Sequence, residues 1–380
     1  TPEGARSVLS TISGSMITVT GVILSTMIVV LTLASQQYGP RLVKNFIEDR
    51  PSQFVVGAFA GCFIYTVITL KNITSGGQDF VPHISVLVAV LLAMFCIGLM
   101  IFFVQHVASS IQVQSIMRRV YNDLNGAIDS LFPENLAEAH ENPVSLEEAL
   151  EKMDADGFSV TEITTANPGY VQLTHDADLI DLAVKHDLLI ELKARPGTFL
   201  LRDAAYARVR SKGELGEQLQ EDLRSVFIVG VFPTAQQDAL FPIRQMEEIA
   251  IRALSPGIND PHTAEECIDY LTCAMRRLGK RDWPSSLRHD DKRELRVIAQ
   301  PYNYETLLRQ AFQQIHFSGR EDISIVTKIV NSLNLIIASL PEESTRRQTA
   351  INFTQELIEE SRHSLPFDAH RERTPECVAG

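Results

Sequence analysis

Three long apolar stretches without a charged side chain dominate the first third of the chain. They run over residues 7–34, 52–70 and 84–105. At a rise of about 1.5 Å per residue, each stretch is long enough to approach or cross a hydrocarbon core about 30 Å thick. The sequence therefore predicts an α-helical membrane domain over residues 1–113, with the lipid bilayer as its surroundings.

The first apolar stretch carries small or hydroxylated residues along one stripe of its helix. The steps between them alternate between four and three residues, and Ile28 occupies the remaining position. The stripe comprises Ser7, Thr11, Gly14, Thr18, Gly21, Ser25 and Thr32. Such a stripe is typical of a tight packing seam, because small residues let helices approach closely and hydroxyls bond between helices. It is equally typical of a pore lining, where hydroxyls replace part of the hydration shell of an ion.

The three predicted spans contain no Asp, Glu, Lys or Arg. Proton-coupled carriers and voltage sensors need charge inside the membrane, so the sequence disfavours both classes. Further hydroxyls beside the stripe add more polarity than one packing seam requires; they belong to Ser10, Ser13, Ser15, Thr20 and Thr26. Three or four spans cannot enclose a pore alone, so conduction of small ions would require a homo-oligomer.

The first predicted loop contains more basic residues than the second. Arg41, Lys44 and Arg50 lie between the first two spans, whereas residues 71–83 carry only Lys71. The positive-inside rule therefore places the first loop and the whole C-terminal region in the cytoplasm. This topology leaves Thr1 outside, and we expect a fourth span upstream of it. His106 at the inner edge of the third span is a candidate pH-sensitive group.

Acidic residues are concentrated downstream of the predicted spans. The chain carries 34 basic and 47 acidic residues, a net charge of −13, but residues 1–113 hold only five basic and four acidic ones. An acidic region disfavours nucleic acid as a partner, since phosphates attract basic surfaces. It favours cations, whose local concentration it raises. The five cysteines form no CxxC pair and predict free thiols.

The region after the spans predicts an α+β organisation. We expect one continuous helix from about residue 84 to 131, within a stalk and linker over 114–144. A small α/β module is predicted over 145–212, a mainly helical domain over 213–363 and a loose tail over 364–380. The module begins with a short helix over 145–155, followed by strands near 170–173, 188–193 and 198–202 and a helix over 176–186. Its order resembles the hammerhead of biotinyl and lipoyl carriers, but no lysine lies between methionines, so we expect an assembly module without a cofactor.

A turn between two downstream helices combines several helix-capping residues, namely Ser255, Pro256, Gly257, Asn259, Asp260 and Pro261. Asp260 as N-cap and Pro261 as first helical residue predict a tight, capped corner. Titratable side chains gather around it: Glu247, Glu248, His262, Glu265 and Glu266. Their spacing matches no metal or catalytic signature, so we expect neither a metal site nor an enzyme.

Two segments together resemble one known family. The first is GARSVLSTISGSMITV at residues 4–19, continued by SQQYGPRL at 35–42, and the second is IAIRALSPGINDP at 249–261. Both are similar to bacterial predicted membrane proteins grouped as domain-of-unknown-function family 2254, with a departure at His262, where the family leads us to expect an aromatic residue. The resemblance implies a multi-pass, four-span inner-membrane protein with a cytoplasmic C-terminal domain. It implies no function.

The leading functional prediction is a homo-oligomeric inner-membrane channel that passes small ions, with cations favoured. The striped helix would line its axis, and the cytoplasmic region would assemble or gate the ring. The alternative is a membrane-anchored scaffold or sensor whose striped helix only packs between helices. The two differ in whether the stripe faces water.

Overall fold

The computed structural model describes residues 1–38, 49–73, 80–110, 112–132, 157–364 and 375–377. The chain divides into two compact units, Thr1–Arg118 and Arg119–Gly380, which we call the membrane unit and the downstream unit. Several predictions lie outside the described residues: the roles of Arg41 and Lys44, the short helix over 145–155, and most of the linker and tail.

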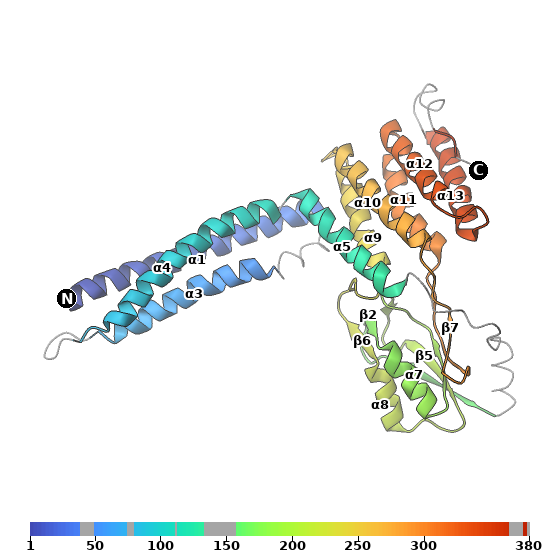
Figure 1. Cartoon of the computed structure of the whole chain (residues 1–380), viewed down its shortest axis with the longest axis horizontal. Coiled ribbons are helices and arrows are strands. Elements are labelled where there is room, and N and C mark those ends of the chain that lie inside the picture. Colours follow the sequence, from blue (N-terminus) through green and yellow to red (C-terminus); the bar gives the residue numbers. More distant parts are fainter. Residues whose placement is uncertain (39–48, 74–79, 111, 133–156, 365–374, 378–380) are drawn as a thin grey trace. The chain divides into compact units, whose positions relative to one another are not determined.

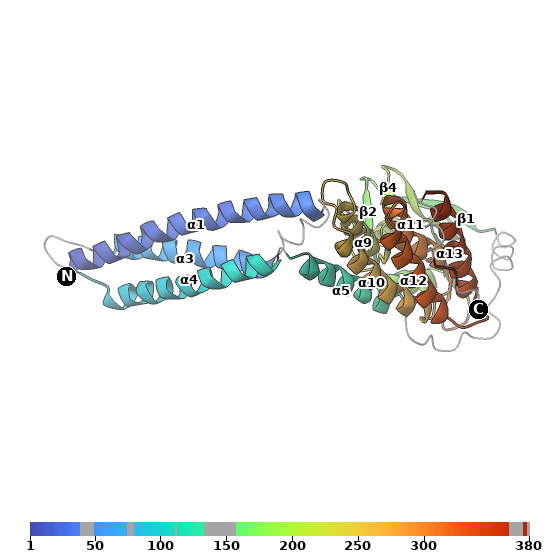
Figure 2. The ribbon, with the colours of Figure 1, turned by 90° about the horizontal axis from the view of Figure 1, so that it is seen from above.

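The membrane unit is a bundle of three helices, α1 (Pro2–Tyr38), α3 (Arg50–Lys71) and α4 (His83–Ser110). The helices run side by side (Figures 1 and 2), and α1 contacts both α3 and α4. Each has a window of mean hydropathy high enough for a membrane span, at 2.3, 1.8 and 3.0. The core between them includes Met16, Ile23 and Phe59. The three predicted spans are therefore present as helices of sufficient length and apolarity.

Polar contacts tie each end of this bundle together. Arg6 donates a hydrogen bond to the carbonyl of Ile73 at 2.7 Å, which links the start of α1 to the segment after α3. Before α3, the Asp49 side chain accepts from the backbone N–H of Ser52 at 3.1 Å and from its hydroxyl at 2.6 Å. Asp49 is thus the N-cap of α3, and a proline at the helix start needs no partner for a missing N–H.

The expected continuous helix from 84 to 131 is interrupted. Helix α4 ends at Ser110, helix α5 (Val113–Leu131) begins three residues later, and Gln112 between them is not helical. The hydroxyls of Ser109 and Ser110 both donate to the carbonyl of His106, at 2.9 and 2.7 Å. Two serine hydroxyls on one carbonyl slightly destabilise the last turn of α4, which favours an interruption after Ser110.

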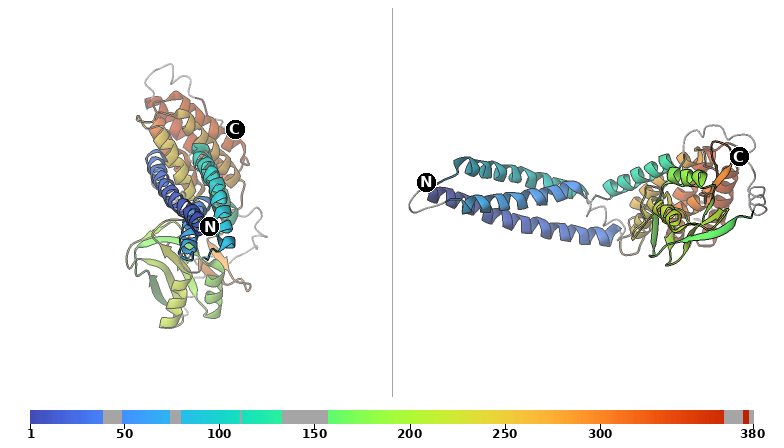
Figure 3. Two further views of the ribbon diagram at one scale, coloured as in Figure 1. Left: turned by 90° about the vertical axis from the view of Figure 1, so that its left-hand side faces the viewer. Right: turned by 90° about the horizontal axis from the view of Figure 1, so that it is seen from below.

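The downstream unit contains two sheets. The larger has the order β1-β5-β3-β8-β7 and comprises β1 (Ser159–Thr164), β3 (Leu189–Leu192), β5 (Ala205–Ser211), β7 (Leu287–His289) and β8 (Leu295–Ile298). The smaller has the order β4-β2-β6 and comprises β2 (Gly169–Thr174), β4 (Phe199–Leu200) and β6 (Phe227–Gly230). Helices α7 (Asp176–Lys185) and α8 (Glu217–Ser225) accompany the strands (Figures 1 and 3). The described part of the downstream unit is thus an α/β region with sheets, followed by helices.

The strand pairing differs from a hammerhead. The expected strands and helix between residues 170 and 202 exist, but β2 and β4 belong to one sheet and β3 to the other. Strand β3 pairs in parallel with β8, with Ile190 opposite Val297. Both side chains are fully buried in one apolar core, and this burial favours a pairing between segments that are distant in sequence. The hairpin of β7 and β8 therefore completes a sheet whose other strands lie between residues 159 and 211.

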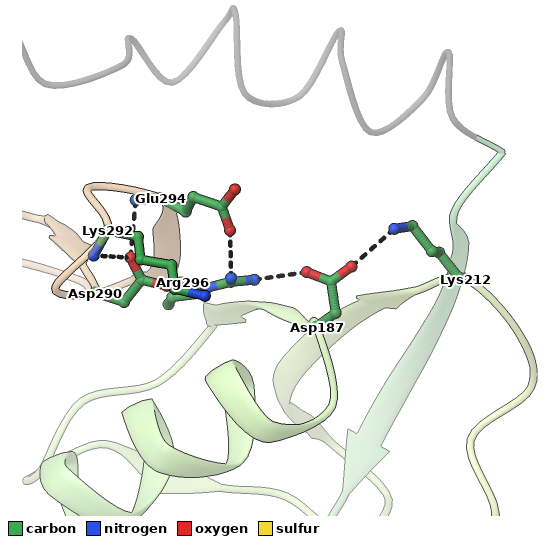
Figure 4. Close-up of polar contacts among 6 residues, drawn as sticks. All are labelled: Asp187, Lys212, Asp290, Lys292, Glu294 and Arg296. Carbon is green, nitrogen blue, oxygen red and sulfur yellow. Dashed lines mark hydrogen bonds and ion pairs between the residues drawn. The ribbon is translucent and has the colours of Figure 1, made fainter.

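A buried arginine fastens this hairpin (Figure 4). Arg296, whose side chain is 7% exposed, binds Asp187 and Asp290 at 2.8 Å each and also contacts Glu294. Hydrogen bonds from Lys212 and Arg296 hold the pKa of Asp187 below its usual value. Burial raises the pKa of Asp290, but the hydrogen bonds that it accepts outweigh this and lower it. We call Arg296 and its three acidic partners, Asp187, Asp290 and Glu294, the Arg296 clamp. The clamp joins the turn between β7 and β8 to the turn after α7.

A group of helices makes up much of the rest of the described part of the downstream unit (Figures 1 and 2). They are α9 (Leu240–Ala253), α10 (Pro261–Gly279), α11 (Tyr304–Gly319), α12 (Ile323–Ala338) and α13 (Thr345–Ser364). Their contacts run from α9 to α10 and α11, from α10 to α12, and from α12 to α13. Arg277 of α10 and Arg281, just after the end of that helix, both bind Asp129 near the end of α5. Trp283, the single tryptophan, packs on Phe132 with ring centroids 4.7 Å apart.

Candidate functional site

The stripe on α1 lies on the side of the helix that faces away from α3 and α4. All seven small or hydroxylated stripe residues and Ile28 are exposed in the described structure. The buried residues of α1 are Leu9, Ser13, Met16, Thr20 and Ile23. They repeat the same alternation two positions later, which is a rotation of about 200° around a helix. The helix therefore has one face packed within the chain and one opposite face that is unused by the described residues.

The threonine hydroxyls on this face bond to their own helix. Thr11, Thr18 and Thr32 each donate to the carbonyl four residues earlier, at 2.8, 2.9 and 2.9 Å. Each hydroxyl hydrogen is thus satisfied, and the lone pairs of each oxygen remain available as acceptors. The face tolerates an apolar neighbour, and it also offers oxygen atoms to water or to a cation.

The glycines of the stripe leave open space beside the helix. A Cβ atom added at Gly14 or at Gly21 would meet no atom within 4 Å. The close approach that glycine permits is therefore not used by any described part of this chain. A spacing of seven residues keeps both glycines on the same side of the helix, where a second helix or a water-filled space has room.

The hydroxyls beside the stripe are split between the two faces. Ser10, Ser15 and Thr26 are exposed, but Ser13 and Thr20 are buried at 9% and 8% exposure on the packed face. The expectation that these two add polarity beside the stripe is therefore wrong. The hydroxyl of Thr20 donates to the carbonyl of Met16 at 2.7 Å, which explains how it is accommodated. Leu9, Met16 and Ile23 recur every seven residues, and Ser13 and Thr20 lie between them at the same four-and-three alternation. This apolar repeat is the sequence signal that identifies the second face.

At the end of the bundle near the start of α3, His106 contacts Asp49, a residue that the sequence did not single out. The His106 Nε2 atom lies 2.9 Å from Asp49 Oδ2, and its ring stacks on Phe102. Burial raises the pKa of Asp49, but hydrogen bonds from Ser52 and His106 outweigh it and hold the pKa below its usual value. A cavity of about 30 Å³ bordered by Asp49, Ser52 and Met27 has room for one water molecule.

Three basic residues were predicted in the first loop, and Arg50 is the one that the structure describes. It is the first residue of α3 and is exposed.

The corner at residues 255–261 lies far away in sequence and belongs to the downstream unit. Asp260 is the N-cap of α10 and accepts from Thr263, at 3.2 Å from the backbone N–H and 2.6 Å from the hydroxyl. Asn259 has a left-handed backbone with φ of 52°.

The corner is closed by hydrogen bonds within the chain. The backbone N–H of Asp260 donates to Ala253 at 2.8 Å, and the hydroxyl of Ser255 donates to Arg252 at 2.6 Å. Pro256 and Gly257 are exposed at its outer side, and Pro261 is the first residue of α10. These contacts account for the corner as a structural element.

The titratable residues near this corner do not converge. Glu247 and Glu248 lie in α9, whereas Glu265 and Glu266 lie in α10, and the His262 side chain is 90% exposed. Across the described residues, no group of three or more His, Cys, Asp or Glu side chains is placed to hold a metal ion.

Comparison with known proteins assigns the family. The sequence profile of a family described as predicted membrane protein (DUF2254) matches residues 1–334. The chain belongs to this family. Uncharacterised proteins of Mycobacterium bovis and Mycobacterium tuberculosis are each 30% identical over 354 residues, covering 91% of this chain. The chain spans 66% of the length of these relatives. No solved structure matches the chain at a significant level.

The family assignment confirms the resemblance found in residues 4–42 and 249–261, and the description of the family as predicted membrane proteins agrees with three membrane-span candidates in the described residues. Neither the family description nor the mycobacterial relatives name an activity.

Proposed function

We propose that this DUF2254 protein is one subunit of a homo-oligomeric channel in the bacterial inner membrane. The stripe on α1 lines the axis, and small ions, with cations favoured, pass along it. The observation that carries the proposal is the exposure of every stripe position from Ser7 to Thr32, on the face opposite the one that packs within the chain. A seam between two helices needs only a few small residues, whereas a pore lining must continue through the membrane.

The chemistry of the stripe supports a preference for cations. The threonine hydroxyls give their hydrogens to backbone carbonyls, so the atoms presented outward are oxygen acceptors. The three predicted spans carry no charged side chain that would bind an ion permanently. The residues after 113 include 29 basic and 43 acidic ones, and this excess of negative charge raises the local cation concentration on the side where that region lies.

The exposure of the three helices supports an assembly of several copies. Inside the chain, only 17%, 28% and 17% of the residues in the apolar windows of α1, α3 and α4 are buried. Three helices with so little mutual burial leave no enclosed path, but a ring of copies with α1 at its axis would provide one. The positive-inside rule places the downstream unit in the cytoplasm in this assembly.

A second function is favoured by the open space at Gly14 and Gly21. Small residues at a spacing of seven let two helices pack closely in lipid, which suits a membrane-anchored scaffold or sensor. In that case α1 is a dry contact between helices, and no ion passes. The two proposals make opposite statements about water at Thr18, in the middle of α1.

The test is the reactivity of Thr18→Cys towards a membrane-impermeant thiol reagent. The background replaces all five native cysteines, because Cys273 is exposed and would react by itself. Ile97→Cys is the matched control, since Ile97 is an exposed residue in the middle of α4 and outside the stripe. The channel proposal expects rapid modification of Thr18→Cys, a reduced conductance afterwards and an unreactive Ile97→Cys.

Two results would contradict the channel. If Ser7→Cys reacts at the helix end while Thr18→Cys does not, the stripe is a dry seam and the scaffold or sensor is favoured. If Thr18→Cys is as unreactive as Ile97→Cys and Ser7→Cys is unreactive too, the stripe faces lipid or the expected fourth span.

A further inference from the structure

The downstream unit contains a cavity of about 310 Å³ that the proposed channel does not use. The segments that meet around it are the end of α5, the end of β2, the turn after β3, and the loops before β7 and after β8. Its wall includes Ser130, Thr174, Arg195, Ser285, Arg288 and Tyr302. A volume of this size is at the lower end of the range for small-molecule sites.

Two arginines on the wall make the cavity cationic within an acidic chain. The Arg195 guanidinium lies 4.5 Å from the centre of the Tyr302 ring, which orients it. Among the described residues, its hydrogen bonding is limited to one long contact from Nη1 to the Pro301 carbonyl at 3.5 Å. Most of the five N–H donors of Arg195 are therefore available to a ligand.

The second arginine neutralises the carboxylate on the wall. Arg288 Nη1 lies 2.6 Å from Oδ2 of Asp176, which also lines the cavity. Arg288 thus balances Asp176, whereas Arg195 is attracted to the buried Asp238 and forms no ion pair with a described residue. Planar guanidinium groups with unused donors are suited to the oxygens of phosphate or carboxylate.

A buried hydroxyl on the same wall has no partner in the described structure. Thr174 is 3% exposed, and its Oγ1 atom makes no hydrogen bond there. The backbone N–H and carbonyl of Thr174 are both bound by the side chain of Gln237, at 2.8 and 3.0 Å, so the residue is held in place. A buried polar group without a partner costs stability, and an accepting ligand oxygen would remove that cost.

The turn that presents Arg195 is fixed by a close contact. Gly197 has a φ of 87°, and a Cβ atom there would lie 2.1 Å from Oδ2 of Asp238. The turn therefore packs directly on Asp238, which is 2% exposed. A guanidinium held in advance by its turn and by Tyr302 loses little freedom when a ligand binds.

We propose that this cavity binds a small anion, a metabolite that carries a phosphate or carboxylate group, through Arg195, Arg288 and Thr174. The ligand contacts the end of α5, the strands and the loop before α11 together, so its binding stiffens the downstream unit. The proposal is independent of whether α1 conducts ions.

The test uses the full chain in detergent micelles, titrated with inorganic phosphate and separately with citrate, against chloride at equal ionic strength. Trp283 fluorescence is the readout, because this single tryptophan directly precedes Pro284 on the cavity wall. We expect a saturable change with at least one of the two anions. Arg195→Gln and Arg288→Gln should each weaken binding by about tenfold, since each removes a charged donor.

Thr174→Val separates a binding role from a structural one. The unpartnered hydroxyl contributes no bond to the unliganded protein, so the unfolding temperature without anion should stay equal or rise slightly. Anion binding should nevertheless weaken several-fold. The matched control is Arg202→Gln, which removes an exposed arginine outside the cavity wall and should bind like the wild type.

The response to the two anions distinguishes the ligand class. Saturation by phosphate alone assigns a phosphate ligand, and saturation by citrate alone assigns a carboxylate ligand. The proposal is overturned if neither anion gives a saturable change beyond that of chloride. It is also overturned if Arg288→Gln and Thr174→Val both bind as tightly as the wild type, a comparison that stands even if Arg195→Gln does not fold.

Discussion

At single residues, close contacts determine backbone conformations that the sequence does not predict. Gly197 and Asp238 are separated by forty positions, yet the glycine backbone and the carboxylate are in direct contact. The sequence marks Pro196 and Gly197 as a turn, but not the residue that the turn packs against. The turn was thus predictable from its residue types, whereas its contact with Asp238 depends on the folded chain.

We predict that Gly197→Ala destabilises the downstream unit by about 2 kcal/mol or more, because a left-handed backbone is strained in alanine and Asp238 blocks the new methyl group. Urea unfolding of the full chain followed by Trp283 fluorescence measures the change. Gly213→Ala is the matched control, since a Cβ atom there would meet no atom within 4 Å. Equal midpoints for the two variants would show that the contact with Asp238 is unimportant.

At the scale of helices and strands, capping groups and buried charges decide where elements begin and what they pack against. The Asp49 and Asp260 side chains each cap a helix that has proline as its first or second residue, and the sequence predicted the cap at Asp260. Strand β8 is different. Its short sequence, Leu295–Ile298, has no clear alternation, and its partner β3 lies more than one hundred residues earlier.

We predict that Asp260→Ala lowers the free energy of unfolding of the downstream unit by about 1 kcal/mol, because the N-cap hydrogen bonds to Thr263 are lost. Asp260→Asn should retain most of the stability, since asparagine also accepts a hydrogen bond from the helix start. Trp283 fluorescence in urea measures both variants. An Asn variant as unstable as the Ala variant would mean that charge, not capping, is the important property.

The Arg296 clamp should make stability depend on pH. Asp187 and Asp290 have pKa values below their unfolded values, so their contribution is complete above about pH 4 and is lost as the pH falls through the folded pKa values. We predict that Arg296→Met costs about 3 kcal/mol near neutral pH, because Asp290 stays buried without its partner. The difference from the wild type should shrink in acid, where both carboxylates become protonated.

Unfolding of the wild type and of Arg296→Met in urea at several pH values tests this prediction. Arg208→Met is the matched control, since Arg208 pairs with the half-exposed Glu162 on the same sheet and should cost less than about 1 kcal/mol. A constant difference between wild type and Arg296→Met at all pH values would refute the assigned role of the carboxylates.

For the whole molecule, hydropathy predicted the helices long enough to span a membrane, but the sequence did not predict how distant segments meet. Uninterrupted apolar runs predicted three spans, since few other structures bury so many consecutive apolar residues. The stripe was equally visible, but only the structure shows that it points away from α3 and α4. The anion cavity was not predictable, because its wall combines Ser130, Thr174, Arg195 and Arg288 from segments far apart in sequence.

If α1 is a packing seam, as the scaffold or sensor requires, we predict that Gly14→Ile abolishes self-association of the full chain in detergent, because the larger side chain fills the open space where a second helix would pack. Light scattering during size-exclusion chromatography measures the oligomeric state. Gly98→Ile in α4 is the matched control, since Gly98 is equally exposed, has no atom within 4 Å of an added Cβ and lies outside the stripe. Loss of association in both variants, or in neither, would show that the copies do not associate through the stripe.

The parallel pairing of β3 with β8 has a consequence for the order in which the chain can fold. During synthesis, Leu189–Leu192 emerges from the ribosome well before Leu295–Ile298, and until then one edge of β3 remains open. Contacts between residues so distant in sequence form slowly, and an open strand edge is prone to pair with other chains. A nascent chain that stalls before the last strand would therefore be a substrate for chaperones or proteases, even with its apolar helices already in place.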